Sequence, residues 1–208
     1  VVSGNVSFYN QTKEIGIKPT PSIGGIGLIK DYKKMVTMNL KELNNLVIVI
    51  GKTEGHMDQS LFARNILDEK NGPPPVVNLF NEKNNGESLL KLIEKNFIKS
   101  AHDVSLGGIL TALSKMCIKG NKGIKLEKTK NLMNDIEYFF SEDQGRYIVE
   151  IDQKDWKEVS KILDKNSVHH EKLGIIVDKN IIINDKIKVT IDELKSYNNN
   201  WLKDYMST

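Results

Sequence analysis

The amino-acid sequence predicts a layered α/β (α+β) domain with a mixed sheet. Short apolar runs that end at turn residues are typical of buried strands, and segments with apolar residues at helical spacing lie between them. Interleaved helices, strands and hairpins pack as layers around one core. Residues 1–32 differ, because they are rich in Gly, Pro, Ser and Thr and lack the apolar content to fold alone. We therefore expect residues 39–208 to form the α/β domain and residues 1–38 to be the remnant of a preceding domain.

The predicted strands are short, largely apolar runs bounded by turn residues. The clearest is residues 45–50, which end at Gly51 and suit a strand that is buried on both faces. The turn residues Asn184-Asp185-Lys186 join two apolar runs and predict a hairpin. In chain order, the predicted strands are residues 45–50, 98–102 (a short strand or a turn), 145–151, 173–177, 181–183 and 187–189.

The predicted helices carry their apolar residues on one face. Thr190 and Glu193 form a capping box that opens the last helix. The strongest apolar stripe follows a Gly-Gly pair and should pack on the sheet; it consists of Ile109, Leu110, Leu113, Met116 and Cys117. The other predicted helices are residues 60–70, stopped by Gly72-Pro73-Pro74-Pro75, residues 87–97, and residues 152–163 with Trp156, Val159, Ile162 and Leu163 facing inward.

The composition is that of a globular protein. The chain has 208 residues, of which 39% are hydrophobic and 27% charged, and its mean hydropathy is −0.37, which argues against disorder. No apolar run approaches the roughly 18 residues of a membrane span, and no signal segment is visible. Cys117 is the single cysteine, so no internal disulfide can form, and a reducing, cytoplasmic compartment fits best.

The basic charge balance does not indicate a nucleic-acid partner. The net charge is +3, but nearly all the cations are lysines scattered among acids, and Arg64 and Arg146 are the only arginines. Bidentate recognition of phosphates and bases favours arginine. The sequence therefore predicts a lysine-rich solvated surface, with neither a nucleic-acid nor a membrane partner.

The sharpest local feature is the run from Ser3 to Asn10, Ser-Gly-Asn-Val-Ser-Phe-Tyr-Asn. A glycine at a strand end lets the backbone approach an anionic ligand closely, which points to Gly4. Asn5 and Ser7 offer a carbonyl oxygen, an amide and a hydroxyl to a metal, a phosphate or water. Magnesium takes oxygen ligands and keeps several waters, so Asn5 alone is a partial site. On chemistry alone such a run is more often only a turn than a ligand site, and both interpretations stay open.

This run belongs to a series of blocks that closely resembles the second nucleotide-binding half of the large synthetase subunit of formylglycinamide ribonucleotide amidotransferases (phosphoribosylformylglycinamidine synthase II). The resemblance continues through residues 17–28 and spans essentially the whole chain. Four further blocks agree in order and spacing: residues 55–60, 73–79, 101–108 and 140–147. The resemblance implies an aminoimidazole ribonucleotide synthetase-like C-terminal domain, preceded by part of a nucleotide-binding, N-terminal-type domain.

The resemblance also implies an ATP-dependent ligase of purine biosynthesis that uses Mg²⁺. In that reaction ATP activates the amide oxygen of formylglycinamide ribonucleotide, and ammonia derived from glutamine displaces phosphate to give the amidine. Gly4 resembles a position that contacts ATP, Asn5 a magnesium ligand, and Ser7 a contact to the ribonucleotide. The family's catalytic histidines lie in its N-terminal half. No catalytic residue is therefore assigned in this chain, and the chain by itself is expected to be inactive.

The same resemblance implies protein partners. Ammonia would come from a separate glutaminase subunit, and a small accessory subunit belongs to the complex. The missing N-terminal half of the same polypeptide is the third expected partner. The chain starts at Val1 inside an apolar stretch, and we interpret that start as a cut within a longer protein.

Two departures from the family pattern concern an auxiliary nucleotide site in this half of the enzyme. Leu106 stands where Asp is usual, and Asp143 stands where a small residue is common. Both changes weaken the case for a nucleotide there. Glu142 and Gln144 are expected to cap or line that vestigial pocket, and Arg146 is expected to be an ion-pair partner.

The histidines give weaker signals. His102-Asp103 before a Gly-Gly helix start has the composition of a proton relay. Adjacent side chains usually point in different directions, however, and we interpret the block as a structural turn before a core helix. His56, His169 and His170 show no metal-ligand spacing with Cys or acids, so we expect them at the surface or in loops.

Two alternative functions stay open. Another member of the same ATP-binding superfamily, such as aminoimidazole ribonucleotide synthetase, shares the two-domain build. The Ser-Gly-Asn-Val-Ser loop and the Phe-Ser-Glu block from Phe140 favour the amidotransferase over it. The other alternative, from a different class, is a non-catalytic scaffold domain that keeps the fold and supplies an interface.

Overall fold

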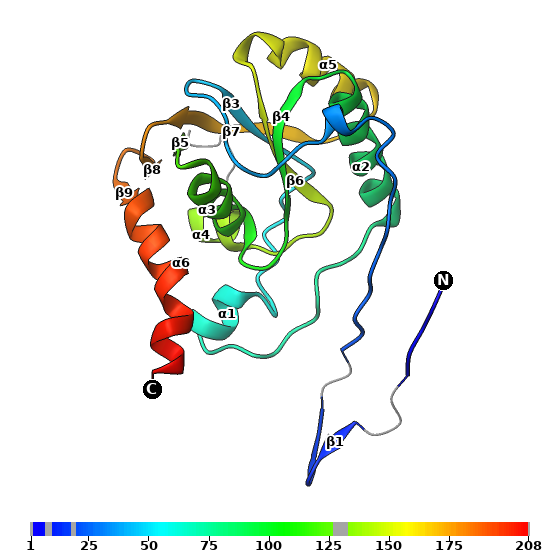
Figure 1. Ribbon diagram of the computed structural model, residues 1–208, viewed down its shortest axis with the longest axis vertical. Helices are drawn as coiled ribbons and strands as arrows, with labels where there is room; N and C mark the ends of the chain where they lie inside the picture. Colours follow the sequence, from blue (N-terminus) through cyan, green and yellow to red (C-terminus); the bar gives the residue numbers. More distant parts are fainter. Residues whose placement is uncertain (1, 7–9, 18–19, 127–132, 208) are drawn as a thin grey trace. The chain divides into compact units, whose positions relative to one another are not determined.

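The computed structural model describes residues 2–6, 10–17, 20–126 and 133–207 (Figure 1). It divides into two compact units, Val1–Tyr32 and Lys33–Thr208. In the first unit, β1 (Gln11–Thr12) and β2 (Ile15–Gly16) form a small antiparallel hairpin. The large apolar side chains described in this unit are exposed; they include Val6, Ile23, Ile26 and Leu28. Within its described residues the first unit therefore has no apolar core.

The second unit is built on a sheet of seven strands in the order β4-β6-β3-β7-β5-β8-β9 (Figure 1). Every neighbouring pair is antiparallel except β5 and β8, which are parallel. The sheet is therefore mixed, as the sequence predicts. Its strands are β3 (Leu46–Ile50), β4 (Ile98–Val104), β5 (Gly123–Leu126), β6 (Arg146–Ile151), β7 (His170–Val177), β8 (Asn180–Ile183) and β9 (Ile187–Thr190).

Helices cover both faces of this sheet. The helices α2 and α5 contribute to the apolar cluster on one face, and α3, α4 and α6 contribute to the cluster on the other (Figure 1). The sheet is thus the middle layer of three. The helices are α1 (Leu61–Ile66), α2 (Leu79–Glu94), α3 (Gly108–Gly120), α4 (Asp135–Phe140), α5 (Trp156–Lys165) and α6 (Ile191–Met206), with short 3-10 turns η1 (Tyr32–Lys34) and η2 (Gln153–Asp155).

The inner position of β3 in the sheet explains why its sequence is continuously apolar. Successive side chains of a strand point to opposite faces of the sheet. Leu46, Ile48 and Ile50 join the cluster with α2 and α5, whereas Val47 and Val49 join the cluster with α3. All five side chains are buried. A strand covered on both faces cannot alternate apolar and polar residues, and the predicted strand at 45–50 is confirmed.

Leu113 gives the most direct test of this core. Its side chain is fully buried in the cluster between α3 and the sheet. Replacing Leu113 by alanine should lower the free energy of unfolding by about 2–5 kcal/mol, because emptying a packed core position costs both transfer and cavity energy. Chemical denaturation of the two proteins measures the difference, with exposed Leu90→Ala as the matched control. A loss below about 1 kcal/mol would contradict this packing of α3 on the sheet.

Several element boundaries differ from the sequence prediction. The helix predicted at 87–97 begins eight residues earlier, at Leu79, because Asn78 caps it by accepting a hydrogen bond from the Asn81 amide. The helix predicted at 60–70 ends at Ile66, and Asp68 has a left-handed φ of 54°. The strands β4 and β7 are longer than predicted, and η2 precedes α5. The short elements β5 and α4 were not predicted at all.

The hairpin and the last helix agree with the sequence prediction. The strands β8 and β9 pair in antiparallel register through Ile183 and Ile187. Thr190 and Glu193 form the reciprocal capping box at the start of α6. The hydrogen bonds from Thr190 hold the pKa of the Glu193 carboxyl below its ordinary value. Among the described residues, no helix is long and apolar enough to cross a membrane.

Candidate functional site

A polar pocket of about 430 Å³ lies where two loops meet the start of α2. One loop follows β3, and the other links α4 to β6. Carboxamides, carboxylates and one lysine dominate its wall, so it is suited to a polar ligand. The lining residues are Lys52, Glu54, Gly55, His56, Val76, Asn78, Asn81, Glu82, Asn85, Asp143, Gln144 and Gly145.

Gly51 starts the first loop and brings the two loops together. Its φ of +100° belongs to a conformation that favours glycine. A Cβ atom at Gly51 would also lie 2.6 Å from the carbonyl oxygen of Gly145, so a side chain has no room. Beyond it, Lys52 and Glu54 form an exposed ion pair of 2.8 Å, and this contact raises the pKa of the Lys52 ammonium above its ordinary value.

Asp143 fixes the path of the first loop from the second. One carboxylate oxygen accepts hydrogen bonds from the backbone amides of Glu54 (3.0 Å) and Gly55 (3.1 Å), and the other accepts from the amide of His56 (3.1 Å). Asp143 is buried, with 6% of its surface exposed. Three consecutive amides therefore converge on a single buried carboxylate.

The buried Arg146 side chain hydrogen-bonds to residues of both loops. It is fully buried at the start of β6, and its guanidinium donates to the Asp143 carbonyl (3.1 Å), the Thr53 hydroxyl (3.0 Å) and the Ser141 carbonyl (2.7 Å). One guanidinium nitrogen lies 3.8 Å from the Asp143 carboxylate, so the predicted ion pair is present. Burial lowers the pKa of Arg146, and the Asp143 charge opposes that shift.

Of the two residues expected to cap or line a pocket, Gln144 is found in the pocket wall and Glu142 is not. The Glu142 carboxylate accepts from the backbone amides of Leu61 and Gly107, both at 2.8 Å, and so caps the starts of α1 and α3. Gln144 lines the pocket. Leu106 is exposed.

His102 and Asp103 correct one expectation. We expected their side chains to point apart, but the His102 Nδ1 and Asp103 Oδ1 atoms are 3.1 Å apart. Both residues lie in β4, which is the strand at one edge of the sheet. Asp103 is 63% exposed at its side chain, so solvent screens this pair strongly.

The other three histidines have different surroundings. His56 borders the pocket and its Nε2 contacts the Pro73 carbonyl at 3.0 Å, while His169 is exposed immediately before β7. His170 corrects a second expectation, because it lies within β7, its side chain is largely buried, and its Nε2 is 2.8 Å from the Ser160 hydroxyl. In the part of the chain that the structure describes, no group of three or more His, Cys, Asp and Glu could hold a metal ion.

The residues assigned from the sequence lie in the first unit. Gly4 and Asn5 are exposed, and nothing lies within 4 Å of the position that a Cβ atom at Gly4 would take. Ser7 falls outside the described residues. The roles of Gly4, Asn5 and Ser7 stay predictions.

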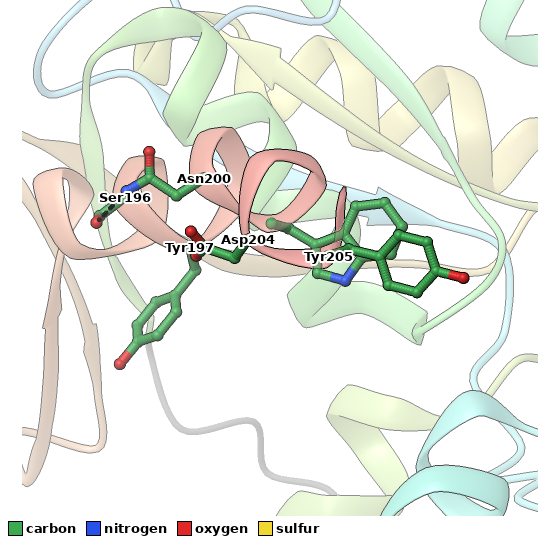
Figure 2. Close-up of a pocket in the computed structure, with 6 residues that line it drawn as sticks. Ser196, Tyr197, Asn200, Asp204 and Tyr205 are labelled. Carbon is green, nitrogen blue, oxygen red and sulfur yellow. Dashed lines mark hydrogen bonds between the residues drawn. The ribbon is translucent and has the colours of Figure 1, made fainter. Parts of the chain in front are cut away.

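A second concave surface lies on α6 alone (Figure 2). Its lining residues come from successive turns of this one helix, and the rings of Trp201 and Tyr205 stack with centroids 5.5 Å apart. Among the described residues, no second element contributes to its lining. The loop pocket, which gathers side chains from three segments, is therefore the better candidate site in the second unit.

Comparison with known proteins first defines the class of the fold. Phosphoribosylformylglycinamidine synthase II from Thermotoga maritima has the same fold, with a TM-score of 0.63, 19% identity, and coverage of 78% of this chain and 28% of that one. T. maritima PurL complexed with FGAR gives a TM-score of 0.64 at 19% identity, over 78% of this chain and 29% of that one. The second unit thus has the layered α/β fold found in these synthases.

The family follows from the sequence itself. Residues 44–185 match the family described as AIR synthase related protein, C-terminal domain. The chain belongs to this family. It is 68% identical to the phosphoribosylformylglycinamidine synthase subunit PurL of Pelagibacter ubique strain HTCC1062 over 99% of its length, and 36% identical to that of Bartonella henselae over the same share. The chain spans 28% of the length of these relatives.

Proposed function

We propose that this chain is the C-terminal part of a phosphoribosylformylglycinamidine synthase, an ATP-dependent ligase of purine biosynthesis. The observation that carries the proposal is the 68% identity to the P. ubique synthase subunit over 99% of this chain. The reaction joins ammonia to formylglycinamide ribonucleotide at the cost of ATP and takes place in the cytoplasm. The T. maritima relatives complexed with ATP and with FGAR support both substrates.

The proposed partners follow the same relationship. We infer that the chain works with the rest of its own polypeptide, with a separate glutaminase subunit that supplies ammonia, and with a small accessory subunit. A structure of PurLQS from T. maritima supports an assembly of several subunits. The scaffold alternative predicts that this part of the enzyme only supports the other parts and touches no substrate.

We assign the nucleotide and metal contacts of this chain to the loop at residues 4–7. Gly4 leaves room for a phosphate to approach the backbone, and Asn5 offers a side-chain oxygen of the kind that magnesium takes. Magnesium would neutralise phosphate charge, while Asn5 and Ser7 orient the groups beside it. Asn5 provides only part of a metal shell, so the remaining ligands come from the phosphates, from water and from other parts of the enzyme.

The isolated chain should show no amidine-forming activity when it is supplied with ATP, Mg²⁺, formylglycinamide ribonucleotide and ammonia. The sequence offers no convincing acid or base in the loop at residues 4–7. Phosphate release that depends on the ribonucleotide is the measurement, and the full-length enzyme is the positive control. Activity of the isolated chain would overturn this expectation.

Calorimetric titration with Mg-ATP separates the ligase proposal from a pure scaffold, which gives no binding heat.

In the full-length enzyme, Asn5→Ala and Ser7→Ala should have different effects. Loss of Asn5 should weaken the magnesium-nucleotide step and be partly rescued by excess Mg²⁺, because water replaces a lost ligand only when metal is abundant. Loss of Ser7 should raise the apparent KM for the ribonucleotide. The increase should correspond to a loss of about 0.5–1.5 kcal/mol of binding free energy, which is the contribution of one neutral hydrogen bond. Steady-state kinetics across a magnesium series measure both. Unchanged kcat and KM in both variants would make this run a plain turn.

A further inference from the structure

The loop pocket contains an arrangement of backbone amides that is typical of anion sites. The amide groups of Glu54, Gly55 and His56 are consecutive, and all three point at one place. Successive N–H groups that converge in this way form a concave nest, which binds phosphate or carboxylate in many proteins. Gly55 has a φ of +82°, the left-handed conformation that lets neighbouring amides turn toward the same point.

A buried cation strengthens this nest. The Arg146 guanidinium lies 3.8 Å from the same carboxylate and is fully buried. A fixed positive charge in a site shielded from water favours a negative partner more strongly than it would at the surface. The nest and Arg146 together therefore define a site for one small oxyanion. This site adjoins the pocket, because Asp143 forms part of the pocket wall.

We propose that residues 54–56 form an oxyanion site which this chain fills with its own Asp143 carboxylate, so that the pocket is closed to phosphate. Both oxygens of Asp143 are engaged by the nest, and the residue is 6% exposed. An incoming phosphate would have to displace this carboxylate and would face Glu54 and Glu82 in the same wall. The pocket accordingly accepts neutral or cationic polar groups. This inference does not depend on the reaction proposed above.

Removal of the Asp143 side chain should open the site to an external anion. Asp143→Gly deletes a CH₂–COO⁻ group, which is acetate with one hydrogen missing. The variant should melt at a lower temperature than the wild type. Acetate should then raise its melting temperature in a saturable manner, because a ligand that binds only the folded state stabilises it by mass action. Acetamide and chloride at equal concentration should not, since one lacks the charge and the other the shape.

Asp143→Asn is the matched control. Its side chain still fills the nest but carries no charge, so acetate should give it no saturable gain. The amide resonances of residues 54–56 report the site directly: acetate and inorganic phosphate should shift them in Asp143→Gly and leave them unchanged in the wild type. If Asp143→Gly does not fold without an anion, recovery of folded protein on refolding in acetate gives the same information, and Asp143→Ser provides a milder variant for the titration.

The outcomes are distinct. Saturable rescue of Asp143→Gly or Asp143→Ser by acetate, with shifts at residues 54–56, supports the proposal. Equal effects of acetate, acetamide and chloride, or refolding that is indifferent to acetate, would overturn it. Inorganic phosphate that binds the wild-type protein at these amides would overturn it as well, because the site would then be open with Asp143 in place.

Discussion

Replacing Glu150 by alanine is expected to lower the free energy of unfolding by on the order of 3–5 kcal/mol. Glu150 lies in β6 and is fully buried. One oxygen of its carboxylate accepts from the Glu42 amide (3.0 Å) and the Asn45 side chain (2.8 Å), and the other accepts from the Lys41 amide (2.8 Å) and the Ser100 hydroxyl (3.0 Å). Alanine leaves all four donors in a buried or half-buried place without this acceptor.

The loss should exceed that of an ordinary hydrogen bond because the acceptor is ionised. Hydrogen bonds to charged groups contribute about 1.5–3 kcal/mol each, although several on one carboxylate do not add fully. Glu150→Gln should lie between the wild type and Glu150→Ala, since it keeps one acceptor oxygen but turns an amide toward the donors. Urea unfolding measures all three, with exposed Glu158→Ala as the control. A loss below about 1 kcal/mol for Glu150→Ala would show that water replaces the carboxylate without penalty.

Replacing Gly108 by alanine should cost more than about 3 kcal/mol and can prevent folding. Gly108 opens α3 with a φ of +71°, which a residue with a side chain rarely adopts. An added Cβ would lie 2.6 Å from the carbonyl oxygens of Phe139 and Ser141, which are backbone atoms and cannot swing away. Strained backbone and overpacking therefore act at the same position.

Gly24→Ala is the matched control for Gly108→Ala. Nothing lies within 4 Å of the Cβ that it would add, and its φ is not in the left-handed region. Its melting temperature should equal that of the wild type, whereas Gly108→Ala should give either a melting temperature lower by several degrees or insoluble protein. A Gly108→Ala protein that is as stable as the wild type would mean that α3 does not start at a left-handed Gly108.

The sequence predicts those helices and strands whose burial requires a recognisable pattern of apolar residues. The strand β3 and the helix α3 are apolar at every position that a buried strand or a one-sided helix requires, so both were predicted. The first half of α2 was missed because exposed Leu79 and Phe80 and a run of asparagines give it no apolar stripe. Its start was visible in the capping residue Asn78. The strand β5 has only four residues, too few to show a period.

The candidate site was less predictable, because its geometry joins distant parts of the chain. The sequence singled out Gln144 as a pocket residue and Arg146 as an ion-pair partner, and the structure places them so, whereas Glu142 caps two helices and does not line the pocket. The partners of Asp143 are amides 87 to 89 residues away, and backbone amides carry no side-chain signature by which a sequence could reveal them. The roles of Gly4, Asn5 and Ser7 rest on family resemblance and stay predictions.

The position of β3 in the sheet has a consequence for the time course of biosynthesis. Its two neighbours, β6 and β7, follow it by roughly 100 residues or more, so at about 5–20 residues per second the ribosome needs several seconds to make them. During this interval β3 is an apolar strand without partners, and such segments aggregate readily. Folding must then close long loops before the strand gains its neighbours, which makes it slow. The nascent chain therefore depends most on protection by chaperones before Val177 leaves the ribosome.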